Sequence, residues 1–255
     1  MTIKSNISIV SYINTIPLLY GIEQSQELNK IITLSKDYPA ECARKITENE
    51  VVAGLASVGI LSENPDYHIV SDMCIACEGK VDSVLLCSNV PLEKITKIHL
   101  DYQSKTSNLL VQILANKFWQ IYPAYSTTTI GYEDTISNSE AAVIIGNRAF
   151  IYQKKFKYVF DLGLEWYKFK KSPFVFACWF AKKEISPLLK ELLDKAQQFG
   201  LENINKAINC FQTNLIIDLH EYLSQTIKYN FDSRMRIALN QFLFEIDELK
   251  KGEYT

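Results

Sequence analysis

Ser-Tyr-Ile-Asn-Thr-Ile-Pro-Leu, the stretch from Ser11 to Leu18, decides how the rest of the chain is organised. It follows a short apolar run, Asn6–Val10, which predicts a strand, and it precedes a helical pattern that runs from Pro17 to about Glu23. Proline suits the first turn of a helix because its missing N–H leaves no hydrogen bond unmade there. The stretch is therefore predicted to be a loop between the carboxyl end of a strand and a helix.

Loops at the carboxyl ends of strands are where open α/β sheets bind ligands. The helix that follows presents unpaired N–H groups, which favour an anion, and Asn14 and Thr15 add an amide and a hydroxyl. The loop has no charged side chain and no obvious general base. We interpret it as one wall of a site for a small, carboxylated ligand.

The composition is that of a soluble globular protein. Of 255 residues, 47% are hydrophobic and 22% are charged, with a formal net charge of -2, which gives no sign of a nucleic-acid or membrane partner. No apolar run reaches the ~18 residues of a membrane span, and the opening residues lack the apolar core of a signal peptide. We expect a cytoplasmic protein whose six cysteines are reduced.

Strands and helices alternate from Asn6 to Val58, which predicts a parallel sheet with both faces covered. Two extended runs, Tyr67–Ala76 and Val81–Ser88, follow and are predicted to form a hairpin or two antiparallel segments. A second α/β unit begins near Lys97, and the chain is mostly helical after Phe180.

Two α/β units joined by extended crossings predict a two-lobed α/β protein with a ligand cleft between the lobes and C-terminal helices. The crossings are expected near Ser83–Ser88 and Phe176–Trp179. The first lobe would then be discontinuous, residues 1–86 with 178–255, and the second would be residues 87–177. A ligand between lobes can be buried by hinge closure.

Two further loops are candidate walls of the site. Ser104–Ser107 lies between a strand end and a helix start, where hydroxyls bind helix N–H groups or an anion held there. The alternative is plain N-capping of the helix. In Gly146-Asn147-Arg148 the glycine permits close backbone approach, and the arginine can pair with a carboxylate. The alternative for Arg148 is an exposed surface position.

Other chemistry is weakly represented. Cys74-Ile-Ala-Cys77 lies in an extended apolar run without a second cysteine pair, so buried, reduced cysteines are favoured over a zinc or redox site. The three histidines are scattered, no Ser-His-Asp or Cys-His spacing is evident, and there is no phosphate-binding glycine loop.

Several segments together resemble one family. The Ser11–Leu18 stretch closely resembles the signature Ser-Tyr-Leu-Asn-Thr-x-Pro-Leu of the chorismate dehydratase family. The resemblance spans about Ile7–Trp179. Five more segments match in the same order: Tyr38–Ala43 (Tyr-Pro-Ser-x-Cys-Ala), Gly79–Val84 (Gly-x-Val-x-Ser-Val), Leu100–Ser107 (Leu-Asp-x-x-Ser-x-Thr-Ser), Ile145–Ala149 (Ile-Gly-Asp-x-Ala) and Asp161–Trp179 (the family's last block).

The resemblance implies a type II periplasmic-binding-protein-like fold. It also implies loss of water from chorismate to give 3-[(1-carboxyvinyl)oxy]benzoate, a step of the futalosine route to menaquinone, with no cofactor and no metal. Two departures stand out: Asn147 replaces a usual Asp, and Lys170-Lys171-Ser172 replaces a common Thr-Gly-Leu.

Mapping the matched motifs onto this chain gives the expected site. Asn14 is the expected catalytic residue, orienting the substrate's enolpyruvyl carboxylate, which would itself take the proton, or the leaving hydroxyl. Substrate contacts are expected from Tyr12, Thr15, Ser83, Ser104, Thr106, Ser107, Gly146, Asn147 and Arg148.

Two alternatives remain open at this point. One is the sister enzyme that makes 1,4-dihydroxy-6-naphthoate, whose signature Ser-Pro-Cys-Pro-Asn-Asp is absent here. The other is a cytosolic protein of the same fold that binds a small carboxylate without turning it over.

Overall fold

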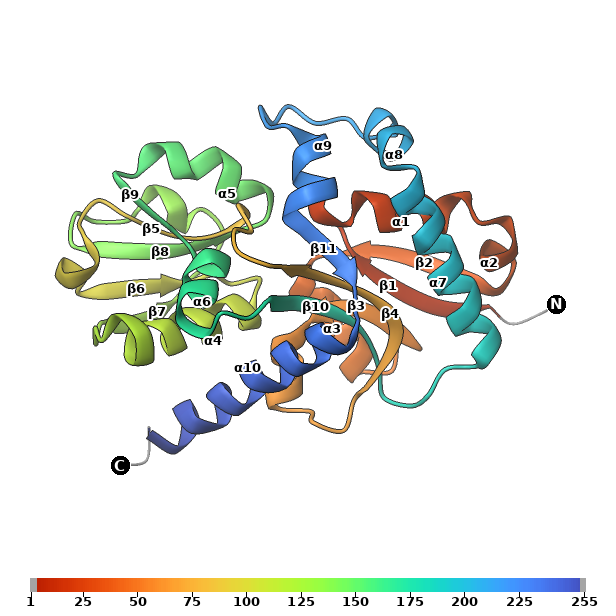
Figure 1. Cartoon of the computed structure of the whole chain (residues 1–255), viewed down its shortest axis with the longest axis horizontal. Helices are drawn as coiled ribbons and strands as arrows, with labels where there is room; N and C mark the ends of the chain where they lie inside the picture. Colours follow the sequence, from red (N-terminus) through yellow and green to blue (C-terminus); the bar gives the residue numbers. More distant parts are fainter. Residues whose placement is uncertain (1–3, 253–255) are drawn as a thin grey trace. The chain divides into compact units, whose positions relative to one another are not determined.

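The computed structural model describes residues 4–252 and divides into two units, which are coloured along the chain in Figure 1. The first unit comprises Met1–Ala76 with Val175–Ser233, and the second comprises Cys77–Phe174 with Arg234–Thr255. The chain therefore passes between the units three times. These passages differ from the expected ones after residues 86 and 177, and the last helix belongs with the second unit.

A six-stranded sheet forms the centre of the first unit. Strand β1 pairs in parallel with both β2 and β3, and β10 closes antiparallel on β3. The strands, in spatial order, are β11 (Ile227–Asn230), β4 (His68–Cys77), β10 (Phe174–Ala181), β3 (Ala53–Ser57), β1 (Ser5–Val10) and β2 (Ile32–Asp37).

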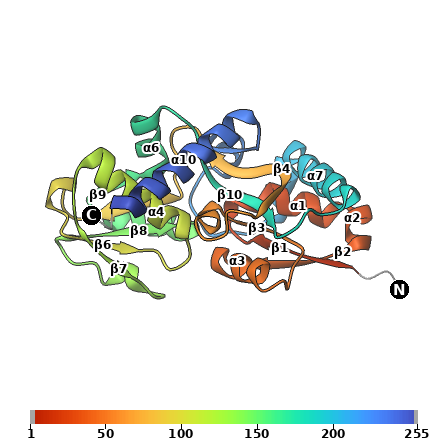
Figure 2. The same ribbon diagram turned by 90° about the horizontal axis from the view of Figure 1, so that it is seen from below.

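Helices cover both faces of this sheet, as the apolar strands require. Figure 2 shows α1 (Ile16–Gln24) and α7 (Pro187–Glu202) on one side of β1 and β2, and α3 (Pro39–Thr47) on the other. The four residues Ile7–Val10 of β1 are buried. Smaller helices complete the unit: η1 (Ile13–Thr15), α2 (Gln26–Ile31), η2 (Val58–Ser62), α8 (Ile204–Cys210), α9 (Leu219–Glu221) and η7 (Tyr222–Thr226).

Two glycines let α1 and α7 cross with their backbones almost touching. A Cβ on Gly21 would lie 1.9 Å from the carbonyl oxygen of Ala196, and a Cβ on Gly200 would lie 1.8 Å from that of Pro17. No side chain fits in either space. This crossing fixes α1, and therefore the loop that enters it, against the longest helix of the unit.

A five-stranded sheet forms the centre of the second unit. Strand β6 is parallel to its neighbours β7 and β8, and β5 is antiparallel to both β8 and β9. The strands, in spatial order, are β7 (Ala124–Thr127), β6 (Lys97–Leu100), β8 (Glu140–Ile145), β5 (Val84–Ser88) and β9 (Tyr158–Asp161). The helical segments are η3 (Leu92–Lys94), α4 (Lys105–Ile113), η4 (Leu114–Trp119), η5 (Tyr132–Asp134), α5 (Asn147–Tyr152), η6 (Gln153–Lys155), α6 (Leu162–Lys170) and α10 (Ser233–Gly252).

Aromatic and ionic contacts hold α10 on the second unit. The ring of Phe242 packs edge-on against Trp166 and Phe174. The buried carboxylate of Glu245 accepts from Lys117 at 2.7 Å and from Lys170 at 2.5 Å. Lys170 therefore helps to anchor the last helix.

The sequence patterns placed most of these elements. The predicted strands at Asn6–Val10 and Lys97–Leu100 are confirmed, as is the helix after Pro17. The hairpin expected from Tyr67 to Ser88 is wrong, because β4 and β5 belong to different sheets. Between them Gly79 and Asp82 adopt φ of 102° and 58° and redirect the chain. Helix α2 and strands β7 and β11 were not foreseen.

Across residues 4–252, no helix combines the length and the apolar character that crossing a membrane would demand.

Replacing Gly200 by alanine should destabilise the first unit. The added methyl group would overlap the Pro17 carbonyl, which is backbone and cannot rotate away, so we expect a loss of about 1–3 kcal/mol in unfolding free energy. Urea denaturation of Gly200→Ala measures it. The exposed Gln198→Ala on the same helix is the control and should unfold at nearly the wild-type midpoint; equal midpoints for both variants would contradict the close crossing.

Candidate functional site

The Ser11–Thr15 loop leaves β1 beside the end of β2. The two strands pair in parallel up to Val10 and Asp37, and the N–H of Ser11 donates to the Asp37 carbonyl at 2.9 Å. The chain then enters η1 and continues directly into α1, with Pro17 in the first turn of that helix. The predicted strand-to-helix loop at a carboxyl end is confirmed.

Thr15 holds the shape of this loop. Its side chain is buried, and its hydroxyl lies 2.6 Å from the Val10 carbonyl and 2.7 Å from the Tyr12 carbonyl, to which it donates. The expected contact of this hydroxyl with a ligand stays a prediction. Tyr12 is half-buried at the residue that precedes η1, in extended conformation.

Asn14 lies in η1 with its amide oxygen in an unusual position. The Oδ1 atom is buried, and within the described part of the chain it accepts no hydrogen bond. Leaving a buried acceptor unpaired costs about 1–3 kcal/mol. Such atoms are uncommon in folded proteins, and among the described residues the Tyr67 hydroxyl and the Asn108 amide oxygen share this state. On the backbone side, the hydroxyl of Tyr229 donates to the Asn14 carbonyl at 2.9 Å.

Asp37, at the end of β2 beside this loop, has its carboxylate fully hydrogen-bonded. Asp37 accepts from Lys45 at 2.7 Å, from the Ser8 hydroxyl at 2.8 Å and from the Ser35 hydroxyl at 2.6 Å. Burial raises the pKa of Asp37, but these hydrogen bonds outweigh it and hold the pKa below its ordinary value. Asp37 is therefore a structural anion and a poor proton acceptor.

In the second unit three predicted loops meet at one edge of the sheet. Strands β6 and β8 are parallel neighbours, so the loops that follow them, at Ser104 and Gly146, emerge at the same edge. Strand β5 runs the other way and pairs Val84 with Ile145, which places Ser83 there too. The N–H of Gly146 donates to the Ser83 carbonyl at 2.8 Å. Seven predicted site residues thus gather in this unit.

Ser104 caps helix α4. Its hydroxyl accepts from the Ser107 N–H at 3.2 Å and lies 2.9 Å from the Ser107 hydroxyl. Ser104, Thr106 and Ser107 are all buried. The capping alternative is thus confirmed for Ser104, and its contact with a ligand stays a prediction.

Gly146 makes the turn from β8 into α5. Its backbone has φ 62° and ψ -143°, a combination that is essentially restricted to glycine. Asn147 is the first residue of α5 and is half-buried. Because α5 begins directly after this turn, the Arg148 side chain reaches Asp101 inside the second unit.

Arg148 is surrounded by internal partners. Its guanidinium donates to Asp101 at 2.6 Å, to Gln103 at 3.1 Å and to Glu133. It also lies over the ring of Tyr102, 4.9 Å from the ring centroid. Its side chain is 20% exposed, whereas those of Asp101 and Glu133 are 0% and 2% exposed. Arg148 therefore ties the loop before α4 to the start of α5, and the alternative of an exposed surface arginine is not observed.

The electrostatics of this cluster, Asp101, Glu133 and Arg148, follow from burial. Burial raises the pKa of Asp101, and the charge of Arg148 with the N–H of Gln103 and the hydroxyl of Tyr132 oppose that rise. Burial also raises the pKa of Tyr132, which donates to Asp101 at 2.8 Å. Since two carboxylates already face Arg148, the charge it can offer to an anionic ligand is small.

Sequence reasoning missed the residues that hold the site in place. Asp101 was visible inside the matched Leu100–Ser107 motif, directly after a strand, but only the hydroxyls there were assigned a role. Glu133 and Tyr132 lie in a loop region without a recognisable pattern. Tyr229 lies on β11, whose four-residue pattern of alternating burial was too short to stand out.

The cysteines at positions 74 and 77 do not form a paired site. Both are buried in β4 and are free thiols. Three residues apart on a strand, their side chains point to opposite faces. Burial raises the pKa of the Cys74 thiol, and the Cys77 thiol donates to the Gly79 carbonyl at 3.3 Å. The expectation of buried, reduced cysteines agrees with this arrangement.

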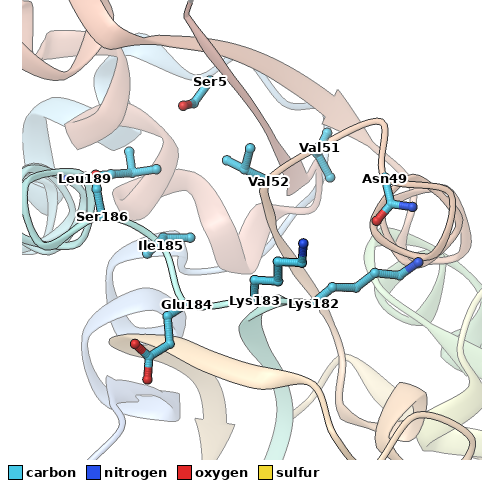
Figure 3. A pocket seen from close by; sticks show the side chains of 10 residues that line it. All are labelled: Ser5, Asn49, Val51, Val52, Lys182, Lys183, Glu184, Ile185, Ser186 and Leu189. Atoms are coloured by element: carbon cyan, nitrogen blue, oxygen red, sulfur yellow. Dashed lines mark hydrogen bonds between the residues drawn. The ribbon is translucent and has the colours of Figure 1, made fainter.

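A pocket in the first unit lies away from the predicted site residues (Figure 3). It has a volume of about 430 Å³ and opens where β1 and β3 begin, the edge opposite to Asn14. None of the predicted site residues lines it. The lining residues are Ser5, Asn49, Val51, Val52, Lys182, Lys183, Glu184, Ile185, Ser186 and Leu189.

Comparison with known sequences finds two matches of note. A family described as menaquinone biosynthesis matches residues 5–248. A protein of Thermus thermophilus named chorismate dehydratase is 26% identical over 213 residues, which cover 76% of this chain and 77% of that protein.

Comparison with solved structures identifies the fold. A protein of Archaeoglobus fulgidus aligns with a TM-score of 0.74 at 15% identity, covering 97% of this chain and 98% of that one. A Candida albicans protein described as having the generic periplasmic binding protein fold aligns with a TM-score of 0.62 at 10% identity, covering 96% of this chain and 90% of that one. The periplasmic aliphatic sulphonate binding protein of Escherichia coli aligns with a TM-score of 0.57 at 13% identity, covering 98% of this chain and 88% of that one. The expected α/β fold of the periplasmic-binding-protein type is confirmed.

Removing the charge of Arg148 should destabilise the second unit. Arg148→Met leaves the buried carboxylates of Asp101 and Glu133 without their cation, so we expect a loss of about 3–5 kcal/mol in unfolding free energy. Arg148→Lys should lose less, because it keeps the charge but not the forked geometry. Denaturant unfolding at pH 7 measures both variants.

The matched control for this series is the exposed Lys154→Met in the same unit, which should stay within about 0.5 kcal/mol of wild type. If Arg148→Met were as stable as Lys154→Met, Arg148 would not hold the loops together.

Proposed function

The chain belongs to the menaquinone biosynthesis family, and on that premise we propose that it is an enzyme that eliminates water from chorismate. The product is 3-[(1-carboxyvinyl)oxy]benzoate. The relative named chorismate dehydratase supports this choice within the family, since the alignment covers about three quarters of both chains. We further propose that the reaction takes place in the cytoplasm and belongs to the futalosine route.

The observation that carries the proposal is the state of Asn14 in the Ser11–Leu18 loop. This loop has the family's signature, it leaves the carboxyl end of β1, and it holds a buried amide oxygen that is not bonded within the described chain. A buried, unsatisfied acceptor on a fixed loop is suited to receive a hydrogen bond from a substrate hydroxyl.

Chorismate carries much of the chemistry itself. The ring hydrogen on the ether carbon leaves as a proton, the neighbouring C–O bond breaks, and the hydroxide takes up a proton to leave as water. The ring gains a double bond and becomes aromatic, which drives the reaction. The active site must hold the substrate in the right orientation, provide a base for the ring proton and assist departure of the hydroxyl.

The predicted site residues favour the substrate as its own base. None of the ten predicted residues bears a carboxylate or an imidazole. Nearby, Asp37 is bonded to Lys45, and Asp101 is bonded to Arg148. We propose that the enolpyruvyl carboxylate takes the ring proton. Asn14 would orient either that carboxylate or the leaving hydroxyl.

The second unit is proposed to bind the carboxylates. Ser83, Ser104, Thr106 and Ser107 lie at one edge of its sheet together with the N-terminal end of α4. Hydroxyls and helix N–H groups there stabilise a negative charge without bringing a competing base. Gly146 and Asn147 lie at the same edge. Arg148 is proposed to hold the neighbouring loops in place through its bonds to Asp101 and Glu133.

Purified protein incubated with chorismate tests the reaction. We expect the aromatic enolpyruvyl ether to appear, detected by mass and by ultraviolet absorbance, without any added cofactor. Unchanged chorismate together with a raised melting temperature would indicate a protein that binds the ligand without turnover. No product and no stabilisation would overturn chorismate as the ligand.

Replacing Asn14 by alanine tests the assignment of the catalytic group. Loss of a preorganised hydrogen-bonding group in the transition state lowers kcat by roughly 10²–10³-fold, and we expect a loss of at least that size. Chorismate binding, followed by thermal shift, should persist. The exposed Asn205→Ala in the same unit is the control and should keep the wild-type rate; an Asn14→Ala enzyme of wild-type rate would refute the assignment.

A further inference from the structure

Tyr229 reaches the signature loop from a distant part of the chain. Its hydroxyl donates to the backbone carbonyl of Asn14 at 2.9 Å, across 215 positions of sequence. Because a carbonyl oxygen only accepts, the direction of this bond is fixed. Desolvation raises the pKa of Tyr229 well above its ordinary value, so the phenol keeps its proton at any working pH.

The strand that carries Tyr229 is itself well anchored. In β11 the side chains of Ile227 and Tyr229 are buried, whereas Lys228 is half-buried and Asn230 is exposed. This alternation points the tyrosine inward. The strand is the neighbour of β4 in the six-stranded sheet, and just beyond it the N–H of Phe231 donates to the Asp72 carbonyl at 2.9 Å.

The other bonds of the loop come from within it or from its two ends, and one of them, from the Thr15 N–H to the Tyr12 carbonyl at 3.0 Å, closes the turn that contains Asn14. The Ser11 N–H is bonded to Asp37, and the Thr15 hydroxyl is bonded to Val10 and Tyr12. These contacts hold the two ends of the loop. The Tyr229 hydroxyl adds a bond from outside the loop to the Asn14 carbonyl, at the residue whose amide oxygen is buried without a partner in the described chain.

We propose that Tyr229 is a positioning residue for the reaction: its hydroxyl fixes the Asn14 peptide and thereby the direction of the Asn14 side chain. This inference rests on the proposed function of Asn14. An amide that must meet one oxygen of the substrate needs its backbone held within a fraction of an ångström, because a displacement of about 1 Å can lower the rate about 10²-fold. The residue touches no reacting atom itself.

Tyr229→Phe tests the proposal with the smallest possible change. It removes the hydroxyl and keeps the ring, so the core around β11 stays filled. We expect kcat for chorismate to fall about tenfold or more, since one positioning bond is lost, and KM to stay within about twofold because Asn14 is not the main binding group. Both constants are measured well below the melting temperature of the variant, with circular dichroism to show that it is folded.

Tyr20→Phe is the matched control in the same unit. Tyr20 stacks on Phe199 with a centroid distance of 6.3 Å and an interplanar angle of 12°, and it lies on α1, directly after the loop. It loses the same atom as Tyr229→Phe and should keep the wild-type kcat and KM.

The outcomes separate the two proposals. If wild type forms no product from chorismate, the proposed function falls, and this inference falls with it. If wild type and Tyr229→Phe share the same kcat, or if only KM or the melting temperature changes, the proposed function stands and Tyr229 has a merely structural role. A fall in kcat that Tyr20→Phe shares would likewise overturn the inference, because the hydroxyl bond to Asn14 would not be its cause.

Discussion

Parallel pairing of neighbouring strands is the constraint on which the site depends. Strand β1 lies parallel to β2, and β6 lies parallel to β8. In each pair the two strands end at the same edge, so the loops that follow them cannot be far apart. The Asn14 loop leaves one such edge, and the Ser104 and Gly146 loops leave the other.

Much of this arrangement was predictable from local pattern, and the rest was not, for physical reasons. The strand at Asn6–Val10 and the helix after Pro17 follow from apolar runs and proline chemistry, and the loop between them follows directly. The position of Ser83 could not be predicted in this way, because it depends on β5 joining a different sheet from β4. Short range pattern carries no information on which sheet a strand joins. The partners of Arg148 were hidden for the same reason, since Glu133 and Asp101 are brought to it only by the folded unit.

Several charged side chains of the two units are paired with one another inside each unit. Asp37 is paired with Lys45, Glu245 is shared by Lys117 and Lys170, and Arg148 faces two carboxylates. Apart from Arg148, the predicted site residues offer hydroxyls, amides and backbone N–H groups. Such groups orient and solvate an anionic substrate without exchanging protons with it. This suits an elimination in which the substrate supplies the base and aromatisation supplies the driving force.

The close crossing of α1 and α7 also bears on how the protein folds as it is synthesised. Gly21 and Gly200 meet backbone to backbone, yet the whole continuous segment of the second unit, Cys77–Phe174, lies between them in the chain. The first helix therefore leaves the ribosome long before its partner exists. Until α7 arrives, the apolar face of α1 and the early strands has nothing to cover it, and such exposed surface is prone to aggregation. Contacts of this sequence separation also slow folding, so the first unit can be completed only after the whole of Cys77–Phe174 has been synthesised.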